Sequence, residues 1–132
     1  MIAGIGCDII SVERIQRIME NNPSFAAKVF LPAEISYCQA KANPYQSFAA
    51  RFSAKEAVMK ALGTGWNGKV NWLDIEVQIS PQGSAHISLS KGAKARAAEL
   101  KVTNIQLSLS HEKEQALAFV VMETEVTGID GN

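Results

Sequence analysis

Residues 73–89, LDIEVQISPQGSAHISL, decide the fold class of this 132-residue chain. Apolar and polar side chains alternate over 73–79, and the same alternation returns over 85–89. A period of two is typical of strands with one buried face, and Ser80-Pro81-Gln82-Gly83 between them supplies turn-forming residues. The stretch therefore predicts a β-hairpin, with Leu73 on its buried face.

Helical patterns fill most of the chain before this hairpin. Residues 2–10 are apolar and rich in β-branched side chains, which indicates a buried strand, and Ser11 can cap a helix after it. Two short helical pieces follow. Asn43-Pro44 then opens a long helix from Tyr45 to Leu62, which ends at Gly63.

Strand patterns return after the hairpin. We expect an alanine-rich helix over 91–100, a half-buried strand over 105–110 and an apolar central strand over 116–122. The helices are grouped instead of alternating one by one with strands. This order indicates an α+β fold, with a largely antiparallel sheet packed against helices and one long central helix at 45–62.

The composition is that of an ordinary globular chain, with 47% hydrophobic and 20% charged residues. Its length predicts one domain, which we place at 1–124, followed by a loose tail over 125–132. Thirteen basic residues balance thirteen acidic ones, so the basic excess of a nucleic-acid-binding protein is missing. No apolar run reaches the roughly 18 residues that cross a bilayer. The two cysteines, Cys7 and Cys38, are too few for a disulfide scaffold, so we expect reduced thiols in a cytoplasmic protein. No charged and then apolar leader precedes the first strand, so we expect no secretory signal.

Asp8 stands out because it lies inside the apolar run at 2–10. A buried carboxylate is costly unless it is paired, hydrogen-bonded or bound to a cation. Two interpretations stay open. Asp8 is either a strand-end residue that accepts hydrogen bonds from nearby backbone amides or a ligand in a functional site.

The long helix carries a second group of charged residues. Its narrow apolar arc consists of Phe48, Phe52, Met59 and Leu62. Lys55 lies inside this arc and Glu56 at its edge, with Lys60 one turn beyond Glu56 on the same side. One interpretation is an exposed Glu–Lys pair, with Lys55 reaching from the arc to water. The other is a carboxylate and an ammonium group presented together for function.

Weaker signals lie elsewhere. The glycines at 63, 65 and 68 could let backbone amides approach a phosphate, although Gly63 is also explained as a helix stop. His111 could donate to an anion or be an ordinary turn residue. Arg14 and Arg17 form a small basic patch on the first helix, or ordinary solvated charge.

Three segments together resemble the holo-acyl-carrier-protein synthases. Residues 4–10, GIGCDII, resemble the amino-terminal G-(I/V)-G-x-D-(I/L/V) motif of that family. Residues 51–65, RFSAKEAVMKALGTG, are similar to its central signature, R-(F/W)-x-x-K-E-A-x-x-K-A-x-G-T-G. Residues 108–111, SLSH, match its S-(I/L)-S-H element. The resemblance spans nearly the whole chain.

This resemblance implies a small, stand-alone 4′-phosphopantetheinyl transferase with an α+β fold. Such an enzyme moves the 4′-phosphopantetheine group from coenzyme A to a serine of apo acyl carrier protein. It releases adenosine 3′,5′-bisphosphate, depends on Mg²⁺ and supports fatty acid biosynthesis. The family is usually trimeric, so we expect a homotrimer with active sites between subunits. Nucleic acids and membranes are not expected partners.

The resemblance also assigns catalytic roles. Asp8 and Glu56 would be the Mg²⁺ ligands, and the cation would offset the desolvation of Asp8. Lys60 would stabilise or protonate the departing phosphate. The attacking serine needs a base, for which we expect a water held by the metal or by a carboxylate.

Binding roles follow in the same way. The coenzyme A site would be lined by Arg51, Phe52, Gly63, Ser110 and His111. If sites are shared, His111 and Asp8 would serve one site from different chains. Arg14 and Arg17 would attract the acidic acyl carrier protein. Lys55 is left between a structural role and a phosphate contact.

Two positions depart from the family pattern. Residues 83–85 lack the proline that often follows the turn glycine, so contacts to the adenosine half of coenzyme A stay open. Glu20 and Asn21 stand where many relatives have a second basic residue, so the docking surface could be weaker or shifted. The alternative is a non-catalytic α+β module that binds a nucleotide or a partner protein, which leaves the carboxylates and Lys60 unexplained.

Overall fold

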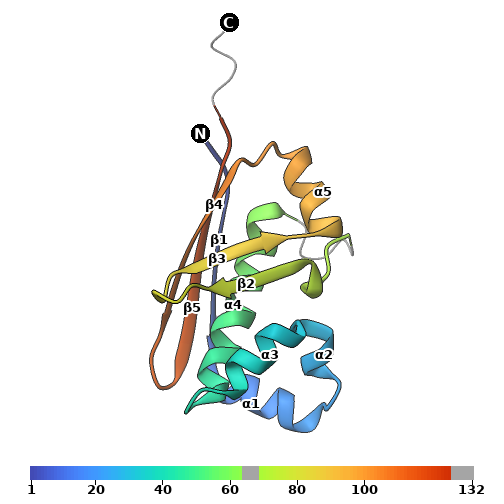
Figure 1. Cartoon of the computed structure of the whole chain (residues 1–132). Coiled ribbons are helices and arrows are strands. Elements are labelled where there is room, and N and C mark those ends of the chain that lie inside the picture. The colour runs from blue at the N-terminus through green and yellow to red at the C-terminus, as the bar shows by residue number, and fades with distance from the viewer. Residues whose placement is uncertain (64–68, 126–132) are drawn as a thin grey trace, which may run out of the picture.

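A three-stranded antiparallel sheet and one long helix form the centre of the fold (Figure 1). The computed structural model describes residues 1–63 and 69–125. The strand order is β1 (Ile2–Ser11), β5 (Gln115–Glu123) and β4 (Asn104–His111), which places β5 in the middle, as predicted. Both pairings are antiparallel, so the expected α+β class with antiparallel strands is confirmed.

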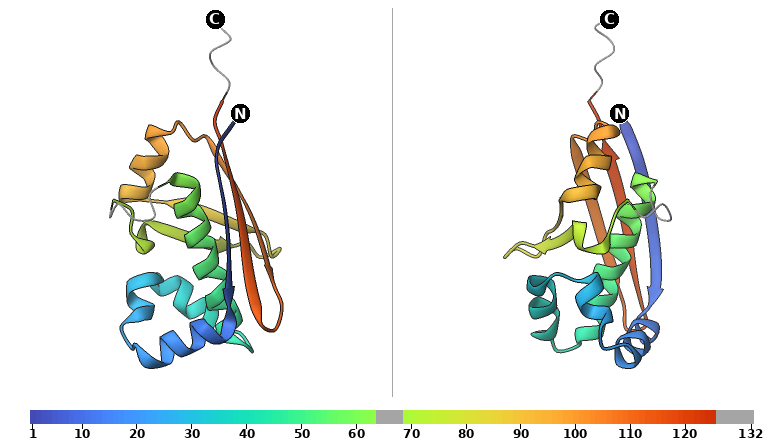
Figure 2. Two further views of the ribbon diagram at one scale, coloured as in Figure 1. Left: turned by 180° about the vertical axis from the view of Figure 1, so that it is seen from behind. Right: turned by 90° about the vertical axis from the view of Figure 1, so that its right-hand side faces the viewer.

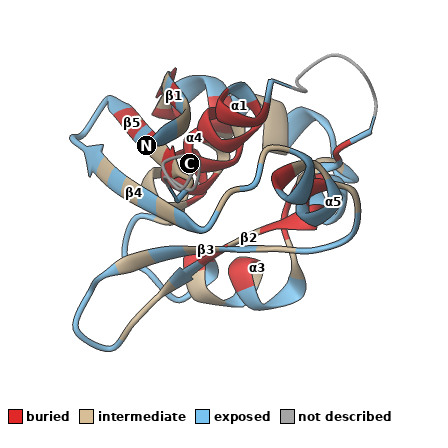
Figure 3. Ribbon diagram, turned by 90° about the horizontal axis from the view of Figure 1, so that it is seen from above, coloured by how far each residue is buried: buried red, intermediate tan, exposed pale blue. Residues whose placement is uncertain are grey.

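The helix α4 (Pro44–Leu62) covers one face of this sheet (Figure 2). Alternate side chains of β5 point toward α4 and are fully buried; they are Ala116, Ala118, Val120 and Met122. Figure 3 shows that burial concentrates on α4 and on the strands beside it. The helix begins at Pro44, one residue before the predicted Tyr45, and Gly63 ends it in the left-handed conformation with φ of 71°.

The smaller helices lie at the two ends of the molecule (Figure 1). At one end are α1 (Val12–Asn21), α2 (Phe25–Val29) and α3 (Pro32–Gln39). The Ser11 hydroxyl accepts a hydrogen bond from the Arg14 backbone N–H at 3.2 Å, which confirms the predicted cap of α1. At the other end lies α5 (Lys91–Glu99), whose Arg96 Nε donates to the Leu62 carbonyl at the end of α4 over 2.9 Å.

The predicted hairpin exists but begins later than its alternation indicates. It consists of β2 (Ile75–Ile79) and β3 (Ala85–Leu89), while residues Trp72–Asp74 form a 3-10 helix, η1. Leu73 is 38% exposed and Asp74 only 4%, so the prediction that Leu73 lies on the buried face was wrong. The Asp74 carboxylate accepts a hydrogen bond from the Asn71 backbone N–H at 3.1 Å, and this local capping prevails over the alternation.

The two ends of the described chain lie together. The Met1 amino group donates to the Thr124 carbonyl over 2.8 Å. The expected loose tail at 125–132 lies outside the described residues except for Glu125, as do the glycines at 65 and 68. Every helix within residues 1–63 and 69–125 is too short or too polar to span a bilayer.

Candidate active site

The strand β1 lies directly against α4 because two of its residues have no side chain. A Cβ atom added at Gly6 would overlap the Ala57 carbonyl oxygen, and one at Gly4 would overlap the Ala61 carbonyl oxygen. No larger residue fits at either position without moving backbone atoms. The close approach brings Asp8, two residues beyond Gly6 on the same face of β1, alongside α4.

Asp8, Glu56 and Lys60 meet on this flank of α4. The Lys60 ammonium donates to Asp8 Oδ1 at 3.1 Å and to the Cys7 carbonyl at 3.0 Å. The Asp8 side chain is 16% exposed and that of Lys60 is 55% exposed, so the cluster opens to solvent. The ion pair of Lys60 is therefore with Asp8, and the exposed Glu56–Lys60 pair considered from the sequence is not the arrangement found.

The electrostatics of Glu56 mark it as a functional candidate. Desolvation raises the pKa of the Glu56 carboxyl, the nearby Asp8 carboxylate raises it further, and Lys60 partly opposes both effects. Two carboxylates held close together without a second cation repel each other. Such a pair is suited to a hard divalent ion.

The donor set also fits Mg²⁺ in number. Within residues 1–63 and 69–125, no group of three or more His, Cys, Asp or Glu side chains could hold a metal ion. Asp8 and Glu56 would contribute two carboxylates and leave the other positions to waters and substrate oxygens. Mg²⁺ is usually bound in this way at sites that handle phosphates.

A separate cavity of about 480 Å³ holds two other candidates, Arg51 and His111. It opens between α4, the β2–β3 turn and β4, and its other walls include Tyr37, Ser47 and residues 83–85. The Arg51 guanidinium lies 4.2 Å from the centre of the Tyr37 ring, and its buried Nε has no hydrogen-bond partner. A buried cation with a free donor beside a cavity is suited to an anion.

The cavity and the carboxylate cluster lie on opposite flanks of α4. Nine residues separate Arg51 from Lys60, and at about 100° per residue they point to opposite sides of the helix. The described chain therefore places the candidates for metal binding and for anion binding in two groups. One protomer does not bring His111 next to Asp8.

The remaining candidates are placed as follows. Phe52 stacks on Trp72 with ring centroids 5.0 Å apart and also contacts Phe25. Gly63 is the helix cap of α4. Ser110 is exposed on the opposite face of β4 from His111, because successive residues of a strand alternate in direction.

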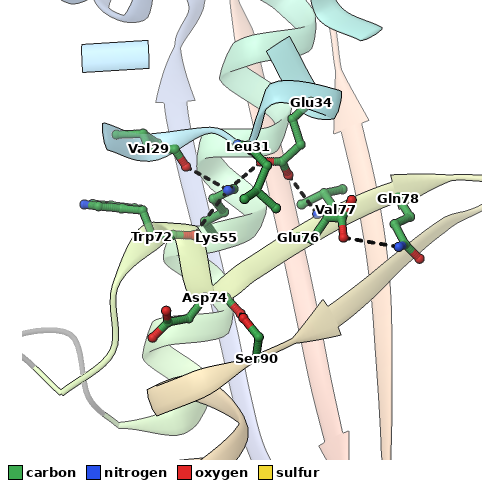
Figure 4. Close-up of polar contacts among 10 residues, drawn as sticks. All are labelled: Val29, Leu31, Glu34, Lys55, Trp72, Asp74, Glu76, Val77, Gln78 and Ser90. Carbon is green, nitrogen blue, oxygen red and sulfur yellow. Dashed lines mark hydrogen bonds and ion pairs between the residues drawn. The ribbon is translucent and has the colours of Figure 1, made fainter. Parts of the chain in front are cut away.

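Lys55 has a structural position that its sequence neighbours do not reveal. Figure 4 shows its fully buried ammonium among Val29, Glu34 and Trp72. It donates to Glu34 Oε1 and to the Val29 carbonyl, each at 2.7 Å, and to the Trp72 carbonyl at 3.2 Å. Burial lowers the pKa of Lys55, and Glu34 opposes that shift. The suggestion that Lys55 reaches water was wrong.

Glu34 completes this network. Its Oε1 accepts from the Leu31 backbone N–H and its Oε2 from the Val77 backbone N–H, both at 2.8 Å. The pair thus joins α3, α4, η1 and β2. Glu34 has no periodic or motif signal in the sequence. The cavity residues Tyr37 and Ser47 were also missed, because only the fold brings them to Arg51.

Comparison with known proteins identifies the family. The profile of the 4′-phosphopantetheinyl transferase superfamily matches residues 4–120. A holo-[acyl-carrier-protein] synthase of Koribacter versatilis is 45% identical over 124 residues, covering 93% of this chain and 99% of the relative. The corresponding protein of Desulforudis audaxviator is 44% identical over 122 residues, covering 92% of each.

Solved structures of holo-[acyl-carrier-protein] synthases also resemble this chain. The crystal structure of holo-[acyl-carrier-protein] synthase from Neisseria meningitidis aligns with a TM-score of 0.85 at 34% identity, covering 94% of this chain and all of that one. The enzyme from Helicobacter pylori, crystallised in complex with coenzyme A, aligns with a TM-score of 0.79 at 32% identity over 90% of this chain and 99% of that one.

The chain belongs to the 4′-phosphopantetheinyl transferase superfamily, a class of group-transfer enzymes. Within this class it is a member of the holo-[acyl-carrier-protein] synthases, since relatives of that name match it over most of its length. The family predicted from the three sequence motifs is confirmed, as is the assignment as a phosphopantetheinyl transferase.

Proposed function

We propose that this enzyme transfers the 4′-phosphopantetheine group from coenzyme A to a serine hydroxyl of an apo acyl carrier protein. Its family and the coenzyme A complex of the Helicobacter pylori relative support the choice of substrates. The observation that carries the proposal is the convergence of Asp8, Glu56 and Lys60 at the contact between β1 and α4.

The reaction forms a bond between the serine oxygen and the phosphorus next to pantetheine, and breaks the bridge of the diphosphate. Adenosine 3′,5′-bisphosphate leaves with the bridging oxygen. The Lys60 ammonium is half exposed and uses two of its three protons for Asp8 and the Cys7 carbonyl. Its third proton would reach that oxygen and stabilise or protonate it. The serine proton passes to a water held near Asp8 or Glu56.

Asp8 and Glu56 would hold the Mg²⁺ ion. When bound, the ion neutralises the negative charge of the diphosphate and of the two carboxylates. Without it, the ionised carboxylates repel one another, as the raised pKa of Glu56 indicates. Asp8 and Glu56 would therefore act on the diphosphate only through the cation that they hold, whereas Lys60 would act on the leaving group directly.

The cavity beside Arg51 and His111 would take the nucleotide end of coenzyme A. Its volume of about 480 Å³ and the unpaired Arg51 Nε suit a phosphorylated ribose. Because this cavity and Asp8 lie on opposite flanks of α4, one coenzyme A molecule would reach both only across two protomers. Sites shared between protomers require an oligomer, which by resemblance to the family would be a homotrimer.

The outer face of the sheet offers a surface for such assembly. Ile5, Ile9 and Phe119 point away from α4 and are 58%, 56% and 42% exposed. The neighbouring outward residues of β4 are polar and include Ser108 and Ser110. A cluster of large apolar side chains that is exposed on one protomer favours self-association. We name this cluster of Ile5, Ile9 and Phe119 the outer apolar patch.

The acyl carrier protein would dock on α1. Arg14 and Arg17 are exposed on this helix, which begins four residues after Asp8, and Arg17 pairs with Glu13 at 2.9 Å. The attraction between these arginines and an acidic carrier protein acts mainly on the rate of encounter. Replacing both with Ala should raise the KM for the carrier protein at low salt and spare the KM for coenzyme A. An unchanged KM and salt dependence would contradict the docking role.

The cellular role of this enzyme is proposed from the family to which it belongs. Holo-acyl carrier protein is the form that carries acyl chains, so the enzyme would support fatty acid biosynthesis. The free thiols Cys7 and Cys38 support action in the reducing cytoplasm.

The test is direct. The purified chain is incubated with coenzyme A and apo acyl carrier protein, with Mg²⁺ or with EDTA, and the carrier protein is analysed by intact mass. We expect one pantetheinyl addition with Mg²⁺ and none with EDTA. No addition in either case, beside a competent control enzyme, would indicate a binding module instead of a transferase.

A further inference from the structure

Ser53 makes a contact with the site that the family signature does not assign. The signature specifies no residue at this position. The Ser53 side chain is fully buried on α4, and its hydroxyl donates to the Asp8 backbone carbonyl over 2.8 Å. A serine inside a helix can instead bond the carbonyl four residues earlier on its own helix. Here the bond crosses to another element, 45 residues away in sequence.

Ser53 continues the line along which β1 and α4 touch. Ala61, Ala57 and Ser53 are spaced by one helical turn each and so share one side of α4. Gly4 packs on Ala61 and Gly6 on Ala57, while Ser53 meets Asp8. The first two contacts are close packing of backbone on backbone. The third is a hydrogen bond, and it is made at Asp8, the residue of this strand whose side chain belongs to the candidate site.

Asp8 is held on both sides of its Cα atom. Lys60 donates to the Cys7 carbonyl, which belongs to the peptide group before Asp8, over 3.0 Å. Ser53 donates to the carbonyl of the peptide group after it. Because both peptide groups are bonded to α4, the Cα–Cβ bond of Asp8 is held relative to Glu56 on that same helix.

From this geometry we infer that Ser53 is a positioning residue that sets the Asp8 carboxylate beside Glu56 for cation binding. The inference rests on the proposed function, because it concerns the same pair of carboxylates. Ser53 does not touch the cation or the substrates. Its effect is on the affinity of the site for a divalent ion and not on the chemical step at saturating ion.

The test compares the wild type with Ser53→Ala and with the control Ser36→Ala. Ser36 is an exposed helical serine on α3, so its replacement changes helix propensity without touching the site. One readout is the broadening of the Asp8 and Glu56 amide signals by Mn²⁺ in ¹⁵N NMR spectra without substrates. The other is the Mg²⁺ concentration that gives half-maximal transfer. Thermal unfolding without metal checks that each variant is folded.

For Ser53→Ala we expect both readouts to require about two- to tenfold more cation, the range in which loss of one hydrogen bond falls. At saturating Mg²⁺ its kcat and its KM for coenzyme A should match the wild type, and Ser36→Ala should behave as the wild type throughout. Equal cation requirements for Ser53→Ala and wild type, with normal transfer, would overturn the inference alone. A wild type that binds Mn²⁺ at these residues but transfers nothing would contradict the proposed function alone.

Discussion

The ionised carboxylate of the candidate metal ligand Glu56 lowers the stability of the fold. Its carboxyl has a pKa raised above the ordinary 4.5 by desolvation and by the Asp8 carboxylate. The folded chain therefore binds this proton more tightly than the unfolded chain does. Stability from this group is present at low pH and is lost as the pH rises through the raised pKa. The negative charge of Glu56 therefore opposes folding, which fits a residue that is kept for cation binding.

Glu56→Gln should separate these two effects. The amide keeps the shape and removes the charge, so we expect transfer to fall by about 10²-fold or more, as for loss of one electrostatic stabiliser. The melting temperature at pH 7 without metal should stay equal or rise, and the decline of stability as the pH rises above the ordinary pKa of 4.5 should be smaller. Transfer assays and thermal scans across pH check both, with the exposed Glu20→Gln as control. Near-normal turnover would exclude Glu56 as a metal ligand.

Single residues also mark the limit of inference from sequence. The position of Asp8 in an apolar strand was a signal that left two interpretations open, and the structure adds its ion pair with Lys60. Lys55 gave a similar signal, but its partner Glu34 lies 21 residues away with no spacing that would point to it. Pairings that only the tertiary fold creates leave no trace in a local pattern.

At the scale of elements, the contact between β1 and α4 depends on Gly6. Gly6→Ala would place a methyl group on the Ala57 carbonyl oxygen, which is backbone and cannot turn away. We expect a loss of about 3 kcal/mol in the free energy of unfolding, at the upper end for overpacking, together with reduced transfer as Asp8 shifts. Urea unfolding measures the first effect. Cys7→Ala, an outward position on the same strand, is the control and should be nearly neutral.

The buried pair of Glu34 and Lys55 connects the elements on the other side of α4. Lys55→Met leaves the Glu34 carboxylate buried with only two backbone donors. Breaking such a pair costs about 3–5 kcal/mol, which lowers Tm by roughly 10–20 °C in a chain of this size. The exposed Lys28→Met serves as the matched control. A change below about 1 kcal/mol in urea unfolding would show that the pair adds little.

Elements were predictable where the signal is local. Asn43-Pro44 and Gly63 bound α4, and alternation revealed β2, β3 and β4. Leu73 and Asp74 were wrongly predicted as strand residues, because they continue the alternation of apolar and polar residues. In the structure they belong to the 3-10 helix Trp72–Asp74, which the Asp74 side chain caps. The sequence motif contains Gly4 and Gly6, but it does not show which element they pack against. Only the structure shows that they let β1 lie directly on α4.

At the scale of the whole molecule, the outer apolar patch should control assembly. Phe119→Glu adds a charge at its centre, so we expect sedimentation to show a smaller species and transfer to fall as shared sites separate. Cys7 pairs with Phe119 across the strands and should react faster with thiol reagents once the patch is uncovered. Gln106→Glu, on the polar outer face of β4, is the control. An unchanged sedimentation coefficient would contradict assembly through this patch.

The arrangement around Lys55 has one more consequence, for chemical modification. All three protons of its ammonium group are engaged, and water does not reach it. Acylating reagents and cyanate attack a neutral, accessible amine, so they will react with the surface lysines and pass over this one. Any acyl group later found on Lys55 was attached while the protein was open, and the rate of its appearance measures how often the core comes apart.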